Sequence, residues 1–308
     1  MRIGIDLGGS AVKIGAVDEN YNIVKRVTVP INDEKGFKRV MDLIDGGVHE
    51  LLEGMETPVS VGIGVPSAIK NKRIAVHTPN LDWYDVDVAA EMNRRFDFPC
   101  VVANDADSAA LGEHLAGAGK NMNTMVLLTL GSGVGGSVVF NGKVLLGKDD
   151  VGVEPGHMKV QIGGELCGCG GHGCLEAYAS ATALKREIRR AVAGERETIL
   201  KKWILEEGVE IGAKPVFDAV RAGDAVGTEI FNQYIYYLAA GVSTCILCYR
   251  PDAIVIGGGI SRAWDLIGDA LNAKVKELTY GADILGCPPC IPAILGNDAG
   301  IIGAAYME

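Results

Sequence analysis

The sequence predicts an α/β protein made of two similarly folded halves. Residues 2–29 have the pattern of strand, glycine turn, strand, polar turn and strand, and residues 124–146 repeat that order. The turn begins at Leu7-Gly8 in the first copy and at Leu130-Gly131 in the second. A weak internal repeat of this kind predicts two halves with a cleft between them.

The first half is predicted to continue with alternating helices and strands. Phe37, Val40 and Leu43 begin a series of apolar residues at helical spacing, which predicts a helix over 36–53. The other expected elements are a buried strand at 59–65, a loop and edge strand at 70–83, a helix at 86–96, a strand at 100–103 and a small-residue helix from 108 to about 118. Asn104 and Asp105 therefore follow the end of a strand.

The second half is predicted to be mostly helical after its three strands. Asn141-Gly142 is a strong signal for a two-residue hairpin turn. Helices are expected at 177–193, 197–206, 214–222, 225–249 and from 260 to about 278, with strands at 253–256 and 291–295 and a short helix at the C-terminus. We predict an N-terminal domain at 1–115, a C-terminal domain at 116–295, and a last helix at 296–308 that packs back on the N-terminal domain.

Composition and charge exclude several classes of partner. The 308 residues are 48% apolar, enough for a sizeable core, and the net charge is −10. A chain without a basic field is not attracted to nucleic acid or to an anionic membrane surface. The uncharged run 234–249 is too short to span a bilayer, and no signal peptide is recognised. We therefore expect a cytoplasmic protein that binds neither nucleic acid nor membrane.

The strongest local signal is a glycine-rich segment at 154–176 that contains one His and three Cys with the ligand types of a closed tetrahedral zinc site. The candidate ligands are His157, Cys167, Cys169 and Cys174. Because the segment holds too much glycine to be a core element, zinc explains these residues better than free thiols do. His172 is an alternative ligand. Glu154 and Glu176 bracket the cluster, so the metal would fix where these carboxylates point.

The other cysteines give weaker signals. Cys100 is predicted to be a core residue of a strand, and Cys245 and Cys248, three residues apart in an apolar helix, to be buried core residues. Cys287 and Cys290 flank two prolines, a pattern that favours a rigid surface turn over a redox or metal-binding role.

The two glycine turns are candidates for phosphate binding. Residues 131–136 match G-x-G-x-x-G, but a strand follows them and a dinucleotide fold requires a helix. The sequence also lacks a Walker A motif and the H-R-D and D-F-G motifs of protein kinases. An ordinary hairpin explains either turn alone, whereas two copies with Asp6 beside the first favour turns whose N–H groups hold phosphate oxygens. Asp6 is a candidate for holding Mg²⁺ through water.

Asp105 is a candidate general base. In phosphoryl transfer to an alcohol, a positioned Asp accepts the hydroxyl proton. The spacing alone favours the alternative in which Asp105 only caps a helix that begins near Ser108, a common role for Asp.

The chain resembles the ROK family of sugar kinases and repressors over essentially its full length. DLGGSAVKIGAV and LGSGVGGSVVFNG are similar to the two phosphate motifs of the family, and VVANDADSAALGE is similar to its catalytic Asn-Asp segment. EPGH and CGCGGHGCLE are similar to its ExGH and CxCGxxGCxE motifs, and these two together are highly specific.

The resemblance implies an actin-like, hexokinase-type (ribonuclease H-like) two-domain α/β fold with sugar and ATP in a central cleft. It implies Asp105 as general base toward the 6-hydroxyl and structural Zn²⁺ on His157, Cys167, Cys169 and Cys174. The implied sugar contacts are Asn80, Asn104, Asp105, Glu154, His157 and Glu176. The implied ATP and phosphate contacts are Asp6, Gly8, Gly9, Ser10, Lys13, Gly131, Ser132, Gly133, Gly257, Gly258 and Gly259.

Some positions depart from the family pattern. Ser10 and Ser132 replace commoner threonines and keep the hydroxyl, Ser137 replaces a glycine, and Ser67 stands where Gly often follows Pro66. The loop before Trp83 is also shorter than usual. Ser67 and this loop are expected near the sugar, so they affect its identity more than the reaction.

The resemblance implies a hexose kinase, with glucose as the first candidate substrate, that forms a homodimer or homotetramer. A kinase for N-acetylmannosamine or N-acetylglucosamine would use the same site residues. A sugar-responsive transcription regulator is a third alternative, but family repressors carry an added N-terminal DNA-binding region, and the first strand here is predicted to begin at Arg2.

Overall fold

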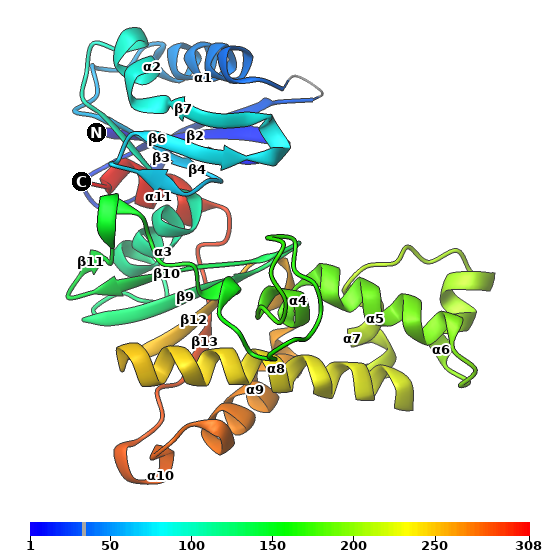
Figure 1. Cartoon of the computed structure of the whole chain (residues 1–308). Coiled ribbons are helices and arrows are strands. Elements are labelled where there is room, and N and C mark those ends of the chain that lie inside the picture. Colours follow the sequence, from blue (N-terminus) through cyan, green and yellow to red (C-terminus); the bar gives the residue numbers. More distant parts are fainter. Residues whose placement is uncertain (33–34) are drawn as a thin grey trace. The chain divides into compact units, whose positions relative to one another are not determined.

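The computed structural model describes residues 1–32 and 35–308. The chain divides into two units, and both are shown in Figure 1. Unit 1 consists of Met1–Leu127, Ser137–Val153 and Ile294–Glu308, and unit 2 of Leu128–Gly136 and Glu154–Ala293. The domain boundaries predicted from the sequence remain a prediction.

The main sheet of unit 1 has the order β3-β2-β1-β4-β8. Its strands are β1 (Arg2–Leu7), β2 (Ala11–Val17), β3 (Ile23–Pro30), β4 (Val61–Val65) and β8 (Cys100–Asn104). The first three strands are antiparallel neighbours joined by tight turns, whereas β1, β4 and β8 run parallel. A parallel pair needs a crossover connection, and α1 (Phe37–Leu52) and α2 (Val88–Arg95) lie in the two crossovers.

The period-two alternation of β1 assigns its residues to two faces. Ile3, Ile5 and Leu7 are fully buried in the core that also contains Val40 and Ile44 of α1. Gly4 faces the opposite side, where α11 (Asp298–Tyr306) packs so closely that a Cβ on Gly4 would lie 1.8 Å from the Ile301 carbonyl oxygen. In unit 1, α1 and α11 thus cover opposite faces of the sheet (Figure 1).

Helix α11 also packs tightly against its other neighbours in unit 1. A Cβ on Gly62 of β4 would lie 1.8 Å from the Ala304 carbonyl oxygen. A Cβ on Gly303 would lie 1.6 Å from the carbonyl oxygen of Ser108 on α3 (Asp105–Ala116). Because no side chain fits at these contacts, the small-residue composition of α3 and α11 is a packing requirement.

A small antiparallel sheet completes the N-terminal part of unit 1. Its strands are β5 (Ile69–Lys70), β6 (Ile74–Thr78) and β7 (Trp83–Asp87), with the short helix η1 (Pro79–Leu81) between the last two. The sequence predicted a loop and one edge strand at 70–83 and a helix from Val86. Val86 instead lies in β7, paired with Ala75, and α2 begins at Val88 after Asp87, whose side chain caps it.

The second main sheet has the order β11-β10-β9-β12-β13. Its strands are β9 (Thr124–Leu130), β10 (Val134–Phe140), β11 (Lys143–Val144), β12 (Ala253–Gly257) and β13 (Cys290–Pro292). Asn141 and Gly142 both have positive φ, 51° and 73°, as the predicted two-residue hairpin requires. The division between the units falls within β9 and β10.

Unit 2 is otherwise mainly helical. Its helices are η3 (Pro155–His157), α4 (Glu176–Ala179), α5 (Ala181–Ala193), α6 (Ile199–Lys201), η4 (Lys202–Glu206), α7 (Lys214–Arg221), α8 (Ala225–Tyr249), η5 (Gly259–Ala263), α9 (Trp264–Leu278) and α10 (Ala282–Leu285), while η2 (Lys148–Asp150) belongs to unit 1. The sequence predicted one helix over 177–193. Ser180 divides it, because its side chain caps α5 by accepting a hydrogen bond from the Ala183 N–H.

The helix α8 contains the uncharged run of the sequence. Between its ends lie buried residues such as Tyr234, Leu238 and Ile246, so the run forms part of the core of unit 2. Within the described residues, no helix is both long and apolar enough to cross a membrane.

Candidate active site

The first glycine turn joins β1 to β2 and lies beside Asp6. The turn is closed by a hydrogen bond from the Gly8 N–H to the Ala11 carbonyl oxygen, 3.0 Å long. Asp6 and Lys13 are directly opposite on the two strands, and their side chains form an ion pair of 3.2 Å. A Cβ on Gly300 would lie 3.1 Å from the Asp6 Cγ, so the first turn of α11 also lies against this carboxylate.

Asn80 lies next to the same turn. A Cβ on Gly9 would be 3.8 Å from the Asn80 amide nitrogen. Asn80 is an exposed residue of η1. Unit 1 therefore brings together the predicted phosphate turn, Asp6, Lys13 and one predicted sugar contact.

Asn104 and Asp105 stand at the start of α3, three residues earlier than the sequence predicted. Asn104 is the N-cap, since its side-chain oxygen accepts hydrogen bonds from the Ala106 and Asp107 N–H groups, 2.8 and 3.0 Å. Its amide nitrogen donates to the Ser67 carbonyl oxygen at 3.0 Å. The alternative in which Asp105 caps a helix from Ser108 is therefore wrong: Asn104 has the capping role, and Asp105 is the first residue of the helix.

Asp105 is thus placed where a negative charge is favoured. The N-terminus of a helix presents N–H groups and the positive end of its dipole, and one Asp105 oxygen accepts from the Ala106 N–H at 2.8 Å.

A second acid in this segment, Asp107, was not singled out from the sequence. It is 4% exposed and accepts a 2.5 Å hydrogen bond from the hydroxyl of Ser137 on β10. A Cβ on Gly152 would lie 2.6 Å from the Asp107 Oδ2, so backbone encloses this carboxylate as well. Ser137 was noted only as a departure from the family motif. The distance of thirty residues between the two partners hid the pairing from sequence reasoning.

The second glycine turn joins β9 to β10 and is bonded to the α4–α5 segment. The Ala181 N–H donates to the Gly131 carbonyl oxygen at 2.7 Å, and the Thr182 hydroxyl donates to the Ser132 carbonyl oxygen at 2.7 Å. Gly258 has φ 82°, and a Cβ there would lie 2.4 Å from the Leu130 carbonyl oxygen. The predicted Gly257–Gly259 segment is therefore held against the strand that leads into the turn.

A cavity of about 500 Å³ in unit 2 adjoins both glycine segments. It is lined by Gly131, Ser132 and Gly259, and also by three side chains that the sequence did not single out, Lys214, Phe217 and Arg262. These residues come from α7 and η5, far from the motifs in sequence, so no local pattern marks them. The volume is in the range of small-molecule and cofactor sites.

The four predicted zinc ligands form one cluster. The ligand atoms of His157, Cys167, Cys169 and Cys174 all lie within 4.8 Å of one another. The Cys167 Sγ is 3.7 Å from the His157 Nδ1, and the Cys169 and Cys174 sulfurs are 3.7 Å apart. A tetrahedral zinc with bonds of about 2.3 Å to sulfur places its ligand atoms about 3.8 Å apart, so the residues fit this metal.

His172 lies outside this cluster. Its Nδ1 is 2.9 Å from the Gly164 carbonyl oxygen, so it has a partner within the loop. The structure therefore favours His157 over His172 as the fourth ligand.

The two carboxylates that bracket the loop differ in their surroundings. One Glu176 oxygen accepts from the Val134 N–H at 3.1 Å, and the other lies 3.2 Å from the Cys167 Sγ. Glu154 is an exposed residue, although its carboxyl group is partly desolvated. This desolvation raises the pKa of Glu154, and the negative charge of Glu176 adds to the increase, whereas His157 opposes it.

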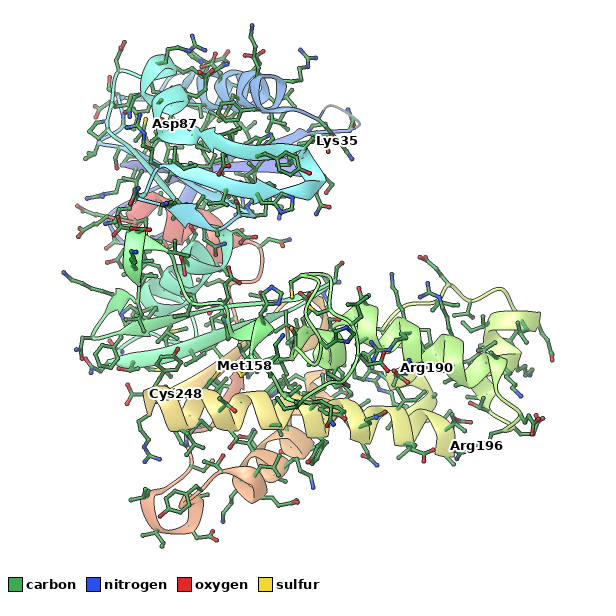
Figure 2. All side chains as sticks on the ribbon, viewed as in Figure 1. Lys35, Asp87, Met158, Arg190, Arg196 and Cys248 are labelled. Atoms are coloured by element: carbon green, nitrogen blue, oxygen red, sulfur yellow. The ribbon has the colours of Figure 1, made fainter. Side chains whose placement is uncertain are left out.

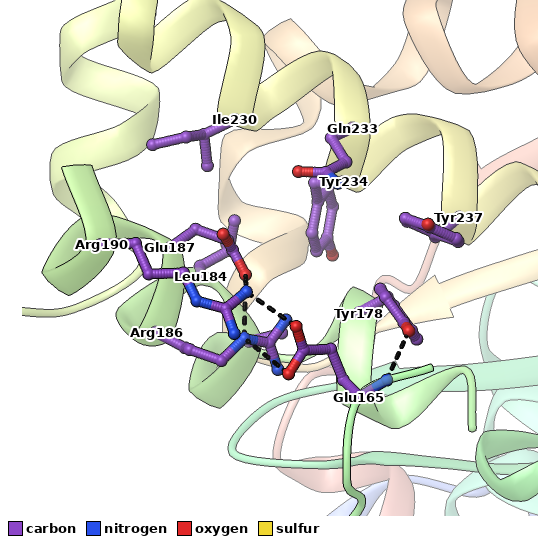
Figure 3. A pocket seen from close by; sticks show the side chains of 11 residues that line it. Glu165, Tyr178, Leu184, Arg186, Glu187, Arg190, Ile230, Gln233, Tyr234 and Tyr237 are labelled. Carbon is purple, nitrogen blue, oxygen red and sulfur yellow. Dashed lines mark hydrogen bonds and ion pairs between the residues drawn. The ribbon is translucent and has the colours of Figure 1, made fainter. Parts of the chain in front are cut away.

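Two supports hold the loop from outside. Leu175 is fully buried against Gly241 of α8, where a Cβ would lie 2.6 Å from a Leu175 methyl group. The Glu165 carboxylate forms an ion pair of 2.7 Å with Arg190 of α5 (Figure 3). The Glu165 backbone N–H donates a hydrogen bond to the Tyr178 hydroxyl at 2.7 Å. The positions of Cys174 and Glu176 thus depend on α8 and α5.

Two predictions for the remaining cysteines are wrong. Cys248, labelled on α8 in Figure 2, is exposed and not buried, because the apolar helix turns this residue away from the core that holds Cys245. Cys290 is a buried residue of β13 and not part of a surface turn, and burial raises its pKa to about 12. Cys100 is only half-buried.

Two mixed sheets, two glycine turns and a helix that begins at a carboxylate place the chain in the actin-like, hexokinase-type α/β class. The model of the ROK family matches residues 2–308, and the chain belongs to this family. It is 37% identical over 305 residues to the glucokinase of Thermotoga maritima, and the match covers 98% of this chain and 95% of the relative. It is 33% identical over 308 residues to the glucokinase of Streptomyces coelicolor, covering 99% and 96%.

A solved structure extends this similarity to three dimensions. The crystal structure of a ROK family glucokinase from Streptomyces griseus in complex with glucose and AMPPNP is 32% identical, with a TM-score of 0.83, and the match covers 99% of this chain and 97% of that one. The predicted fold class is therefore confirmed.

Proposed function

We propose that this chain is an ATP-dependent hexose kinase that transfers a phosphoryl group to the 6-hydroxyl of glucose. The proposal is carried by full-length similarity to two glucokinases in a chain that keeps Asp105 at the start of α3. A match across both units is relevant because the predicted site residues come from both.

In this proposal Asp105 accepts the proton of the 6-hydroxyl as the oxygen attacks the γ-phosphorus. A positioned carboxylate is the usual proton acceptor when an alcohol is phosphorylated. The carboxylate is supported by the α3 N-terminus, and Asn104 fixes that terminus through its bonds to Ala106, Asp107 and Ser67. Asn104 therefore contributes to positioning as well as to the predicted sugar contact.

ATP is assigned to the glycine turns and the unit 2 cavity. The cavity is lined by Gly131, Ser132 and Gly259, which are predicted nucleotide contacts, and by Phe217, whose ring offers an apolar surface to a base. Backbone N–H groups of glycine turns hold phosphate oxygens at little steric cost. Mg²⁺ neutralises phosphate charge when bound, and Asp6 would hold it through water while Lys13 stays near the phosphates.

Residues 154–176, the zinc loop, are assigned to sugar recognition. Zinc on His157 and the three cysteines would be structural, since four protein ligands leave no open position. The Nδ1 of His157 faces the sulfurs, which leaves Nε2 for a sugar hydroxyl. Glu154 and Glu176 supply the carboxylates that accept hydrogen bonds from hydroxyl groups.

A panel of sugars tests the substrate. ADP release is measured with glucose, other hexoses, N-acetylmannosamine and N-acetylglucosamine, with Asp105→Asn as the blank. The highest kcat/KM is expected for glucose. A higher value for an N-acetylhexosamine would replace glucose as the substrate, and no ADP release with any sugar would remove the kinase proposal. Light scattering of the same preparation tests the expected homodimer or homotetramer.

A further inference from the structure

The zinc loop contains a charged group besides the four ligands. The ammonium nitrogen of Lys159 lies 2.9 Å from the Cys174 sulfur. We propose that Lys159 is an outer-sphere charge partner of the zinc–thiolate centre, and that Gly171 is the residue that leaves room for its ammonium group. This inference rests on the zinc binding assigned above and extends it to a residue that takes no part in coordination.

The charge of the centre calls for a cation. One Zn²⁺, three thiolates and a neutral imidazole carry a net charge of −1. A carboxylate oxygen of Glu176 is 3.2 Å from the Cys167 sulfur and adds negative charge on that side. The ammonium group of Lys159 offsets this excess at the sulfur of Cys174.

The three sulfurs have different hydrogen-bond donors. Cys167 accepts from the Cys169 backbone, and Cys169 accepts from the Gly171 backbone. Metal binding removes the thiol protons, so the contacts among the sulfurs then cease to be hydrogen bonds, whereas N–H donors persist. Cys174 is fully buried from solvent, and the donor that the structure gives it is the ammonium group of Lys159.

The backbone fixes this contact. Lys159 and Cys174 are opposite each other in an antiparallel β-bridge. The Leu175 N–H donates to the Met158 carbonyl oxygen at 2.9 Å, and the Val160 N–H donates to the Gly173 carbonyl oxygen at 2.9 Å. Directly opposed residues place their side chains on the same face. The register of the bridge therefore directs Lys159 toward Cys174.

Gly171 leaves space for the ammonium group of Lys159. A Cβ at this position would lie 2.8 Å from the Lys159 Nζ, 3.5 Å from the Cys169 sulfur and 3.8 Å from the Cys174 sulfur. Gly170 and Gly173 have φ of 83° and 75°, so their backbone conformation explains why they are glycines. Gly171 is not among the residues with positive φ, and alanine there would remove space without straining the backbone.

The experiment measures zinc release from the full-length, zinc-loaded protein. Zinc transfer to the chromogenic chelator 4-(2-pyridylazo)resorcinol is followed for wild type, Lys159→Met, Lys159→Arg and Gly171→Ala. Lys185→Met on α5 is the matched loss of a positive charge outside residues 154–176. Loss of an outer-shell partner typically weakens metal binding by about 10–100-fold. We expect release about tenfold faster in Lys159→Met, faster release in Gly171→Ala, and rates near wild type in Lys159→Arg and Lys185→Met.

The ionic strength adds a second readout. Salt screens an exposed charge pair, so the difference between wild type and Lys159→Met should shrink as salt is raised. The proposal is overturned if Lys159→Met releases zinc at the wild-type rate, within about twofold, well below the usual effect of such partners. If circular dichroism shows that Lys159→Met does not fold, an unchanged rate in Gly171→Ala overturns it instead. Metal analysis separates the two claims, because a wild-type protein purified without zinc would remove the zinc site itself.

Discussion

At the scale of single residues, the proposed function depends on how Asp105 is held. Asn104 satisfies the first N–H groups of α3 and bonds to Ser67, so Asp105 is left at the helix start with its carboxylate facing the N-terminal dipole. Sequence reasoning recognised Asp105 as a candidate but gave it the cap as an alternative role. The sequence could not distinguish the catalytic role from the capping role. The start of the helix depends on which of the adjacent residues Asn104 and Asp105 accepts the capping hydrogen bonds from the backbone.

Replacing Asp105 by Asn tests the general-base assignment. The amide keeps the size of the side chain and cannot accept the hydroxyl proton, so kcat should fall by about 10²–10⁴-fold, the usual size of a general-base contribution. Sugar binding, measured by calorimetry, should survive. A variant that keeps a tenth of the wild-type kcat would contradict the assignment.

Replacing Cys169 by Ser tests whether zinc shapes the sugar site. Cys169 is an exposed member of the proposed ligand set, so the change removes that thiol without creating a core cavity. We expect zinc content and sugar affinity to be lost together, because in the proposed site one metal holds both His157 and the segment before Glu176. Normal sugar affinity in zinc-free protein would show that the loop keeps its shape without the metal. Cys248→Ser, at another exposed cysteine, is the control.

At the scale of elements, buried polar contacts connect segments that are distant in sequence. The Ser137–Asp107 hydrogen bond joins β10 to the first turn of α3, and both residues are almost fully buried. Asn141-Gly142 and the helix over 225–249 were predicted from local patterns, because the turn and the apolar run each carry their own signal. Asp107 and the cavity residues Lys214, Phe217 and Arg262 were missed, because each has a role only through partners far away in the chain.

A double-mutant cycle measures the Ser137–Asp107 contact. Ser137→Ala leaves a buried carboxylate without its hydroxyl donor, which should lower the free energy of unfolding by about 1–3 kcal/mol. Ser137→Ala combined with Asp107→Asn should lose less than the sum of the single changes. Urea unfolding of the four proteins supplies the values, and additive losses would show that the two side chains do not interact.

The cap of α8 predicts a dependence of stability on pH. Burial raises the pKa of Asp224, but hydrogen bonds from Gly227, Ile199 and Thr198 outweigh it and hold the pKa below its ordinary value. The stabilisation is therefore present above the unfolded-state pKa of about 3.9 and is lost as the pH falls toward the lower folded-state value. Asp224→Ala should cost about 1–2 kcal/mol at pH 7. The cost, measured by urea unfolding, should diminish below about pH 4.

At the scale of the whole molecule, unit 1 is assembled from three separate stretches of the chain. Its last stretch carries α11, which lies against β1, β4 and α3 with glycines at the contacts. The fold class was predictable from the repeated strand–glycine–strand pattern and the family motifs. The assembly of unit 1 from three separate stretches was not predictable from the sequence. It is determined by which surfaces pack together after the strands have formed.

Deleting residues 298–308 should therefore abolish folding of unit 1. The deletion exposes the residues of β1, β2 and β4 that α11 covers, such as Val17 of β2, which is packed against Ile301 and Ile302. We expect loss of cooperative unfolding and of sugar binding, measured by thermal circular dichroism and calorimetry. A deletion protein that still unfolds cooperatively with wild-type midpoint would contradict the packing role. A deletion of the final residue, the exposed Glu308, is the control.

The position of α11 also has a consequence for synthesis on the ribosome. The helix that completes unit 1 is translated after the whole of unit 2. Residues 154–293 form one continuous stretch that leaves the ribosome before it. Domains that consist of one N-terminal stretch generally fold first during synthesis. Here one face of the N-terminal sheet instead stays uncovered until α11 has been synthesised, after residues 154–293.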